Sequence, residues 1–117
     1  MSQSPLFIKT YDLMAWLIPR TLDFPKRQRG VLARQVQQEL FTFYGSLVDA
    51  AKSKDPLTHL RRADAALVKL RTYLRLCEEL QLLSTRQYGH ACRLIKPVGN
   101  LLGGWLNPLL EKRKTTG

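Results

Sequence analysis

The basic side chains are the groups in this sequence with the clearest capacity for chemistry. Nineteen Lys and Arg outnumber nine Asp and Glu, and the formal net charge is +10. Such an excess favours a polyanionic partner, which can be nucleic acid, an acidic protein surface or anionic lipid. The predicted contact set for such a partner is Lys26, Arg27, Arg29, Arg34, Arg62, Lys69, Arg75, Arg86, Arg93 and Lys96.

The densest cluster of cations opens the second predicted helix. It contains Gly30 together with Lys26, Arg27, Arg29 and Arg34. Cations at a helix N-terminus oppose the macrodipole, so local helix stability does not explain them. Two interpretations stay equally open, a contact for phosphate and a solvated run of charge.

A second cluster shares one face of the fourth predicted helix with glycines. Arg86, Arg93 and Lys96 follow each other at helical spacing, so they project from the same side. A glycine inside a helix costs roughly 1 kcal/mol relative to alanine. Gly103 and Gly104 are therefore expected where something approaches the backbone closely. We favour a neighbouring helix packed without side-chain bulk, and a phosphate backbone is the alternative.

Catalysis has little support in the residue pattern. His59 and His90 have no Cys or carboxylate at ligand spacing on the same helix face. The Glu-x-x-His pattern of di-iron bundles and the Walker-type glycine loop are both missing from the sequence. We therefore expect a protein that is not an enzyme, with no catalytic residue, metal site or cofactor. Cys77 and Cys92 are interpreted as small buried apolar side chains, since a disulfide is disfavoured in a reducing cytosol.

These side chains must be positioned by helices, because apolar residues recur at steps of three and four. Helices are predicted over approximately 6–22, 26–53, 56–82 and 84–111, within one domain of residues 1–117. Short connections make neighbouring helices antiparallel, so the fold class is all-α, an up-down-up-down four-helix bundle. The two central seams are Ala33, Val36, Leu40, Phe43, Leu47 and Ala50, and Leu60, Ala63, Leu67, Leu70, Leu74 and Cys77.

The outer helices carry their own boundary and core signals. Ser84 and Gln87 are at capping-box spacing, and Asp55 is predicted to cap the third helix. Pro97 removes one backbone bond, so we expect a kink in the fourth helix. The core face of the first helix is predicted as Phe7, Tyr11, Met14, Ala15, Ile18 and Leu22, and that of the fourth as Tyr88, Ala91, Ile95, Val98, Leu102, Leu106 and Leu109.

A second, weaker apolar strip runs along the outside of the third helix. Ala65, Val68 and Leu76 lie there among cations, and Trp16 is predicted to lie outside the intramolecular seam of the first helix. An apolar surface beyond the one that builds the fold points to another subunit. The predicted oligomer interface is Trp16, Ala65, Val68, Leu76, Gly103 and Gly104.

Membrane insertion and export are not expected. No apolar run approaches the roughly 18 residues of a membrane span. The first residues lack the charged and small-residue signals of a signal peptide. The sequence is therefore interpreted as that of a cytoplasmic protein without a membrane partner.

Four stretches of the sequence resemble the Avd family, the accessory variability determinants of diversity-generating retroelements. They are YDLMAWL, DFPK, LRLCEELQLLSTRQY and VGNLLGGWL, spread between Thr10 and Leu106. The Gly103-Gly104-Trp105 step is the most specific of these motifs.

The resemblance implies a non-catalytic basic protein that assembles as a ring-like homopentamer. Such a protein binds nucleic acid and the reverse transcriptase of the retroelement, and it supports mutagenic copying of template RNA into cDNA. Two alternatives stay open. One is the bundle family encoded in intervening sequences of 23S ribosomal RNA genes, and the other is a structural assembly protein without a specific nucleic-acid function.

Overall fold

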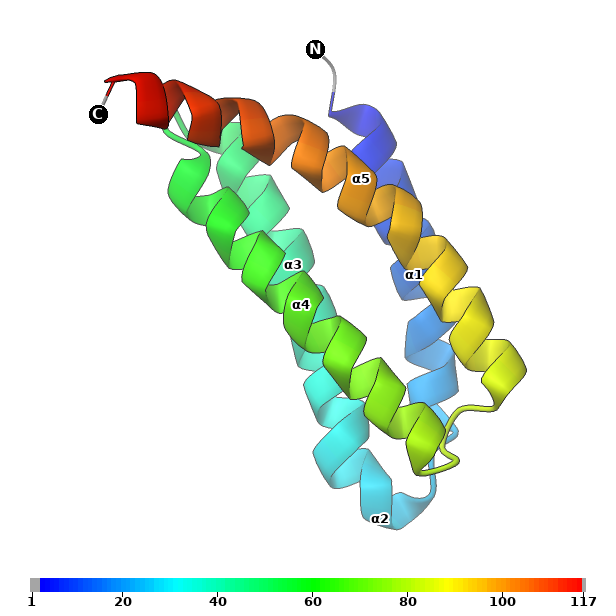
Figure 1. The fold of residues 1–117 in the computed structure, drawn as a ribbon. Helices are drawn as coiled ribbons and strands as arrows, with labels where there is room; N and C mark the ends of the chain where they lie inside the picture. Colours follow the sequence, from blue (N-terminus) through cyan, green and yellow to red (C-terminus); the bar gives the residue numbers. More distant parts are fainter. Residues whose placement is uncertain (1–2, 117) are drawn as a thin grey trace.

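The predicted helices form an antiparallel up-down-up-down four-helix bundle, shown in Figure 1. The computed structural model describes residues 3–116, apart from the side chains of residues 28, 29, 115 and 116. Within that part there is no β-strand. The elements are α1 (Ser4–Leu22), α2 (Lys26–Gln28), the π-helical segment η1 (Arg29–Ala33), α3 (Arg34–Lys52), α4 (Leu57–Glu79) and α5 (Thr85–Thr116).

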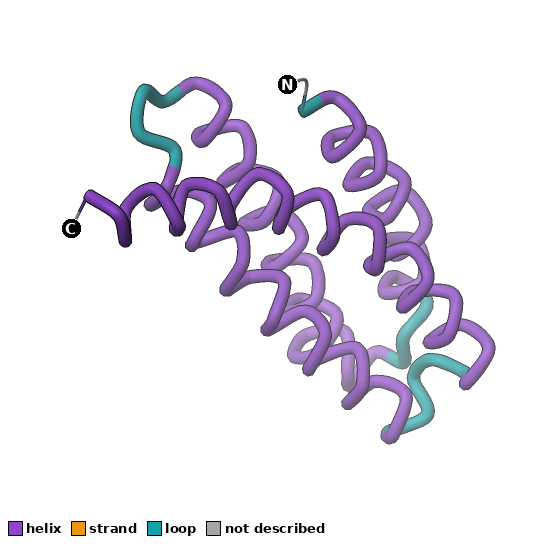
Figure 2. Tube along the Cα trace, turned by 45° about the horizontal axis from the view of Figure 1, so that its top comes forward, coloured by secondary structure: helices purple, strands orange, loops and turns teal. Residues whose placement is uncertain are grey.

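The connections are short and lie at the two ends of the bundle. The links at 23–25 and 80–84 share one end, and the link at 53–56 lies at the other end (Figure 2). The N-terminal turns of α2 therefore lie at the same end of the bundle as the start of α5.

The core is built chiefly on the pair α3 and α4. Both predicted central seams are confirmed, because all twelve of their residues are buried. Phe43 is the largest fully buried side chain, and Leu67, Leu70 and Leu74 of α4 are buried with it. A full apolar face on each of two adjacent long helices supplies most of the area removed from water.

The ends of α4 differ from their predicted positions. Pro56 holds the N-cap position without a side-chain hydrogen bond, so the prediction of Asp55 as the cap is wrong. The Asp55 backbone N–H instead donates to Ser53 Oγ at 3.1 Å, so Asp55 belongs to the turn that precedes α4. At the other end α4 stops at Glu79, before the predicted residue 82.

A Schellman-type turn explains this early stop. Gln81 has a positive φ of 62°, which no helix can continue. The Leu82 N–H then bonds back to the Cys77 carbonyl at 2.8 Å, and the Gln81 N–H bonds to the Glu78 carbonyl at 2.9 Å. Orphan carbonyls of the last turn are satisfied in this way, and the chain reverses into α5.

The start of α5 confirms the predicted capping box. Ser84 Oγ accepts from the Gln87 N–H at 3.0 Å, and Gln87 Oε1 accepts from the Ser84 N–H at 2.9 Å. Pro97 leaves the Arg93 carbonyl without its helical donor. Figure 1 shows the axis of α5 changing direction in its gold-to-orange part, after which the helix continues to Thr116 near the 53–56 link.

The core face of α1 is not the predicted one. Leu6, Leu13 and Leu17 are buried, whereas Tyr11 is 69% exposed and Leu22 is also exposed. The buried stripe includes Thr10 and Thr21, which a hydrophobic pattern counts as polar residues. Their hydroxyls donate to the Leu6 and Ile18 carbonyls, each at 2.7 Å, so burial leaves no hydroxyl unpaired.

The second helix is continuous but not uniform. Its backbone stays helical from Lys26 to Lys52, with η1 inserted between α2 and α3. A π-helical turn holds one residue more than the α-helical ladder allows, and such turns occur mostly as short insertions in α-helices. Gly30 lies in this segment, in agreement with its low helix propensity.

Candidate nucleic-acid interface

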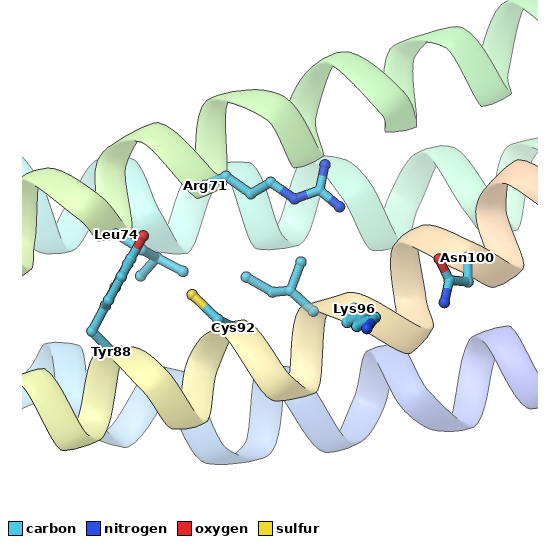
Figure 3. Close-up of a pocket in the computed structure, with 7 residues that line it drawn as sticks. Arg71, Leu74, Tyr88, Cys92, Lys96 and Asn100 are labelled. Atoms are coloured by element: carbon cyan, nitrogen blue, oxygen red, sulfur yellow. The ribbon is translucent and has the colours of Figure 1, made fainter.

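A groove lies between α4 and α5 (Figure 3). It has a volume of about 300 Å³. We call it the α4–α5 groove, and its lining residues are Arg71, Leu74, Tyr88, Cys92, Ile95, Lys96 and Asn100. Two cations and three polar groups therefore border a partly apolar floor.

Arg71 is held in this groove by a glycine on the facing helix. A Cβ atom at Gly99 would lie only 2.6 Å from Arg71 Nη2, so the missing side chain leaves the space that the guanidinium occupies. Figure 3 shows the Arg71 side chain extended between α4 and α5. Arg71 was not in the predicted contact set, because spacing along α4 does not reveal which helix packs beside it.

Lys96 lines the groove from α5, and we call Lys96 together with Arg86 and Arg93 of the same helix the α5 basic stripe. All three are exposed. The Arg93 guanidinium lies 3.5 Å from the Cβ position of Gly89, so it folds back along the helix toward Arg86. Arg71 of α4 and Lys96 of α5 thus supply positive charge from both walls of the same groove.

The predicted cations of α4 are divided between its sides. Lys69 and Arg71 lie two residues apart, about 200° around the helix, so they face different directions. Arg62 lies one heptad before Lys69, so both side chains lie on the side of α4 that faces away from the groove. Arg75 forms the expected i,i+4 pair with Glu79 at 3.5 Å, and an exposed pair of this kind contributes little stability.

The predicted cations of the second helix lie at the end of the bundle where α5 begins. Lys26 and Arg27 of α2 and Arg34 of α3 are exposed. The side chain of Arg29 lies outside the described part of the structure. The structure therefore places α2 and the start of the α5 basic stripe at the same end of the bundle. No described contact joins the two.

Trp16 is not outside the intramolecular packing, which corrects the prediction. It is partly buried against the core, and its ring lies 4.6 Å from the His90 ring of α5. The Arg20 guanidinium carbon is 4.8 Å from the same ring, and Arg20 Nη1 donates to the Trp16 carbonyl at 3.1 Å. A ring with these partners helps to join α1 to α5 and is poorly placed to stack on a base.

Gly103 and Gly104 are open on their outer side. The nearest group to a Cβ at Gly103 is Asn107 Nδ2 at 3.4 Å, and no atom lies within 4 Å of a Cβ at Gly104. No helix of the described part of this chain packs on both glycines, and the favoured explanation stays a prediction for a helix of another subunit. The two glycines instead help to line a shallow depression of about 480 Å³ with Gly99, Asn100, Asn107 and Pro108.

The described residues contain neither a group of metal ligands nor a membrane-spanning helix. No three His, Cys, Asp or Glu side chains gather as metal ligands among them. In the same part of the chain, no helix combines the length and the apolar character needed to cross a bilayer.

Comparison with known families agrees with the predicted resemblance. Residues 6–109, nearly the whole bundle, match the family described as bAvd-like. The chain belongs to the bAvd-like family. This family consists of accessory, non-catalytic proteins of diversity-generating retroelements, so the match favours the first of the predicted families over the ribosomal intervening-sequence proteins. No curated protein matches the chain.

Two apolar surfaces of the bAvd-like chain are left uncovered. The predicted strip on α4 is exposed at Ala65, Val68 and Leu76. The other surface lies along the junction of α1 and α3, where sequence analysis placed core residues. We call it the α1–α3 apolar surface, and its exposed members are Ile8, Tyr11, Leu22, Val31, Phe41 and Tyr44.

One aromatic contact joins α1 to α3 beside the α1–α3 apolar surface. Phe7 and Tyr44 meet edge to face with ring centroids 6.2 Å apart. Because α1 and α3 are antiparallel, one turn from this contact brings Tyr11 of α1 toward Phe41 of α3. Gln37 Nε2 also bonds to Thr21 Oγ1 at 2.8 Å, which is a second contact between α1 and α3 further along.

The two cysteines of the bAvd-like chain have different environments. Both are free, and Cys77 is buried as predicted. Cys92 is exposed in the α4–α5 groove, so its predicted burial is wrong. A side-chain hydrogen bond with Cys92 raises the pKa of Tyr88, and burial adds to this effect. The Tyr88 hydroxyl therefore stays protonated at neutral pH and can act as a donor.

A maleimide is expected to alkylate Cys92 and to spare Cys77 in the folded protein. Burial raises the pKa of the Cys77 thiol to about 11, and the thiolate is the reactive form. At neutral pH such a thiol holds roughly 100-fold less thiolate than an ordinary one, and its burial also blocks the reagent. Mass spectrometry of tryptic peptides after timed labelling measures both rates. Equal labelling of the two cysteines at native conditions would contradict the described packing around Cys77.

Proposed function

We propose that this bAvd-like chain is the basic subunit of a homopentameric accessory ring that binds template RNA or its cDNA and the retroelement's reverse transcriptase. The observation that carries the proposal is the convergence of cations on the α4–α5 groove. Arg71 from one wall and Lys96 from the other, with Arg86 and Arg93 exposed along the same helix as Lys96, give the surface a charge that favours phosphate. The groove holds no carboxylate among its lining residues.

Nucleic-acid affinity is expected to fall steeply with salt, and charge reversal on the α5 basic stripe should flatten this dependence. Each phosphate contact adds roughly 0.7 to 0.9 to the slope of log K against log salt. Arg86→Glu with Arg93→Glu should therefore lower the slope by roughly 1.4 to 1.8. Fluorescence anisotropy with a labelled RNA over a series of salt concentrations gives the slope, and circular dichroism reports whether the helices persist.

A matched variant separates a local site from general attraction. Arg62→Glu with Lys69→Glu changes the net charge equally but lies on the flank of α4 away from the groove. This variant should keep most of the wild-type slope. Equal losses in both variants would mean that overall charge alone drives binding. A slope near zero in the wild-type protein would refute electrostatic nucleic-acid binding altogether.

A second candidate role for the same face is docking of the reverse transcriptase. The specific observation is the open depression over Gly103 and Gly104, which no side chain of the described structure fills. A protein surface can approach a helix backbone closely at such glycines. If the Arg86→Glu and Arg93→Glu protein binds RNA normally but fails to retain the polymerase in a pull-down, the face serves protein docking.

The proposed ring requires two different surfaces on each subunit. A cyclic pentamer closes through heterologous contacts, in which one patch meets a different patch on the next copy. The α1–α3 apolar surface and the α4 strip form such a pair, since they lie on different helices of the bundle. Large exposed apolar patches on a small domain are typical of interaction surfaces.

A further inference from the structure

The floor of the α4–α5 groove has the chemistry of a site for a flat, partly apolar group. Leu74 and Ile95 lie buried beneath it, with 0% and 3% of their surface exposed, and the half-buried Tyr88 ring is the aromatic group that borders it. Figure 3 shows the Tyr88 ring between α5 and Leu74 of α4, at one end of the groove. An exposed edge of this kind suits stacking, which is sequence-tolerant because every base has a π-face.

The rim of the groove has the chemistry of an anion site. In the described part of the chain neither Arg71 nor Lys96 has a hydrogen-bond or ion-pair partner. Glu78 lies near enough to the Tyr88 phenol to help raise its pKa, so the carboxylate nearest the groove is at its Tyr88 end. The Arg71 and Lys96 end, beside the Asn100 amide, is left as the place for a negative charge.

We propose that the α4–α5 groove binds one unpaired nucleotide of a single strand, with the base against the Tyr88 ring and its phosphate between Arg71 and Lys96. This inference rests on the proposed nucleic-acid binding and names the form of nucleic acid that is bound. The volume of about 300 Å³ is at the lower limit for a ligand pocket, which fits a single nucleotide. Paired bases are stacked inside a duplex and cannot enter a groove between two helices without being extruded.

The surroundings favour a polyanionic strand over an acidic peptide. The groove continues through Asn100 into the depression over Gly103 and Gly104, and Asn107 links that depression to a further one beside Arg61. Arg86 and Arg93 extend the positive charge in the opposite direction along α5. A strand that places one base in the groove thus meets cations for its neighbouring phosphates on both sides.

Cys92 offers a reporter inside the groove. The probes are a short oligothymidine and an abasic strand with the same number of phosphates. Oligothymidine should slow alkylation of Cys92 at least about fivefold, in line with the energy of stacking one base. The abasic strand should slow it much less, because it brings equal charge without a base. A Cys92→Ala protein with Lys54→Cys in the 53–56 link is the control, and neither strand should protect this cysteine.

Affinity measurements on a groove variant give the second readout. Tyr88→Leu keeps an apolar side chain but removes the aromatic ring. It should weaken oligothymidine binding by at least about fivefold and leave binding of the abasic strand unchanged. The wild-type protein should also prefer oligothymidine to a duplex of equal phosphate content in the alkylation assay.

The outcomes distinguish this inference from the proposed function. Equal protection and equal affinity for the normal and abasic strands, both falling with salt, would overturn the nucleotide site and leave phosphate binding intact. Failure of both strands to bind at low salt would remove the proposed function as well. Protection of Cys92 by the reverse transcriptase but by neither strand would make the groove a protein-docking site and overturn the inference.

Discussion

Replacing Tyr11 and Phe41 with glutamate is expected to convert the assembly into 13.5 kDa monomers. Tyr11 is 69% exposed and Phe41 is 56% exposed, so neither replacement opens the core. In an interface, however, each change would bury a carboxylate without a partner, which costs several kcal/mol. Light scattering coupled to size exclusion measures the mass, and circular dichroism should show unchanged helix content.

The α4 strip provides the complementary variant. Val68→Glu with Leu76→Glu should also give monomers if the ring is built from two different patches. Mixing the two variants should then restore one intact interface and produce a species of twice the monomer mass, with no larger ring. Lys54→Glu, which alters the net charge by the same amount as either double variant, should leave the wild-type mass.

Three results would contradict this arrangement. A Tyr11→Glu, Phe41→Glu protein of wild-type mass would show that the α1–α3 apolar surface is not an interface. Dimers formed by the α4 variant alone would indicate that like patches meet, as in a two-fold dimer. A monomeric wild-type protein at micromolar concentration would remove the ring altogether.

Phe43→Ala is expected to lower the free energy of unfolding by about 3 to 5 kcal/mol. The Phe43 side chain is 1% exposed and lies in the most extensive helix pair, so its removal leaves a cavity. Phe41→Ala is the matched control, because it removes the same ring two residues away from a position that is 56% exposed. Under conditions that keep both proteins monomeric, the control should change stability by less than about 0.5 kcal/mol.

Urea titration at several protein concentrations measures both variants and separates unfolding from dissociation. If Phe43→Ala lowers the free energy of unfolding as little as Phe41→Ala does, the core collapses around the cavity or α3 is rotated from its described orientation. The comparison therefore tests the phase of α3, on which both the core and the α1–α3 apolar surface depend.

The sequence is sufficient to predict α3 and α4 because one face of each is far more apolar than the rest. The stripes through Phe43 and Leu70 are the stronger ones on their helices, so the hydrophobic period assigns the core. The capping box of α5 is equally local, since Ser84 and Gln87 satisfy each other within one turn. Features that depend on neighbouring residues alone are thus the ones that a single sequence predicts best.

The face of α1 could not be predicted by the same reasoning. It carries two apolar stripes of similar strength, and the one through Tyr11 and Ile18 is the more continuous. Burial selects the other stripe because Thr10 and Thr21 satisfy their hydroxyls on their own helix. The error has a useful consequence, since the rejected stripe contributes to the exposed α1–α3 apolar surface.

The candidate site was predicted in part. Lys96 and the α5 basic stripe follow from helical spacing, whereas Arg71 enters the groove only through the packing of α4 beside Gly99 of α5. Gly99 is unfavourable inside a helix, and this is visible in the sequence. A long side chain such as Arg71 on the neighbouring helix would explain it, and the sequence does not show which helix that is. Trp16 was misplaced because its partners, Arg20 and His90, come from one turn further along α1 and from another helix.

The π-helical segment separates two parts of one helix that obey different constraints. From Ala33 onward, each residue of α3 is held in register by the core, and a shift of one position would rotate every side chain by about 100°. The extra residue in η1 absorbs such a shift before it reaches Val36 and Leu40. We expect changes of length between the buried Phe24 and Ala33 to redirect Lys26 and Arg27 while the bundle keeps its packing. The basic end of the molecule is free to diversify in length and direction, and the rest of the helix is not.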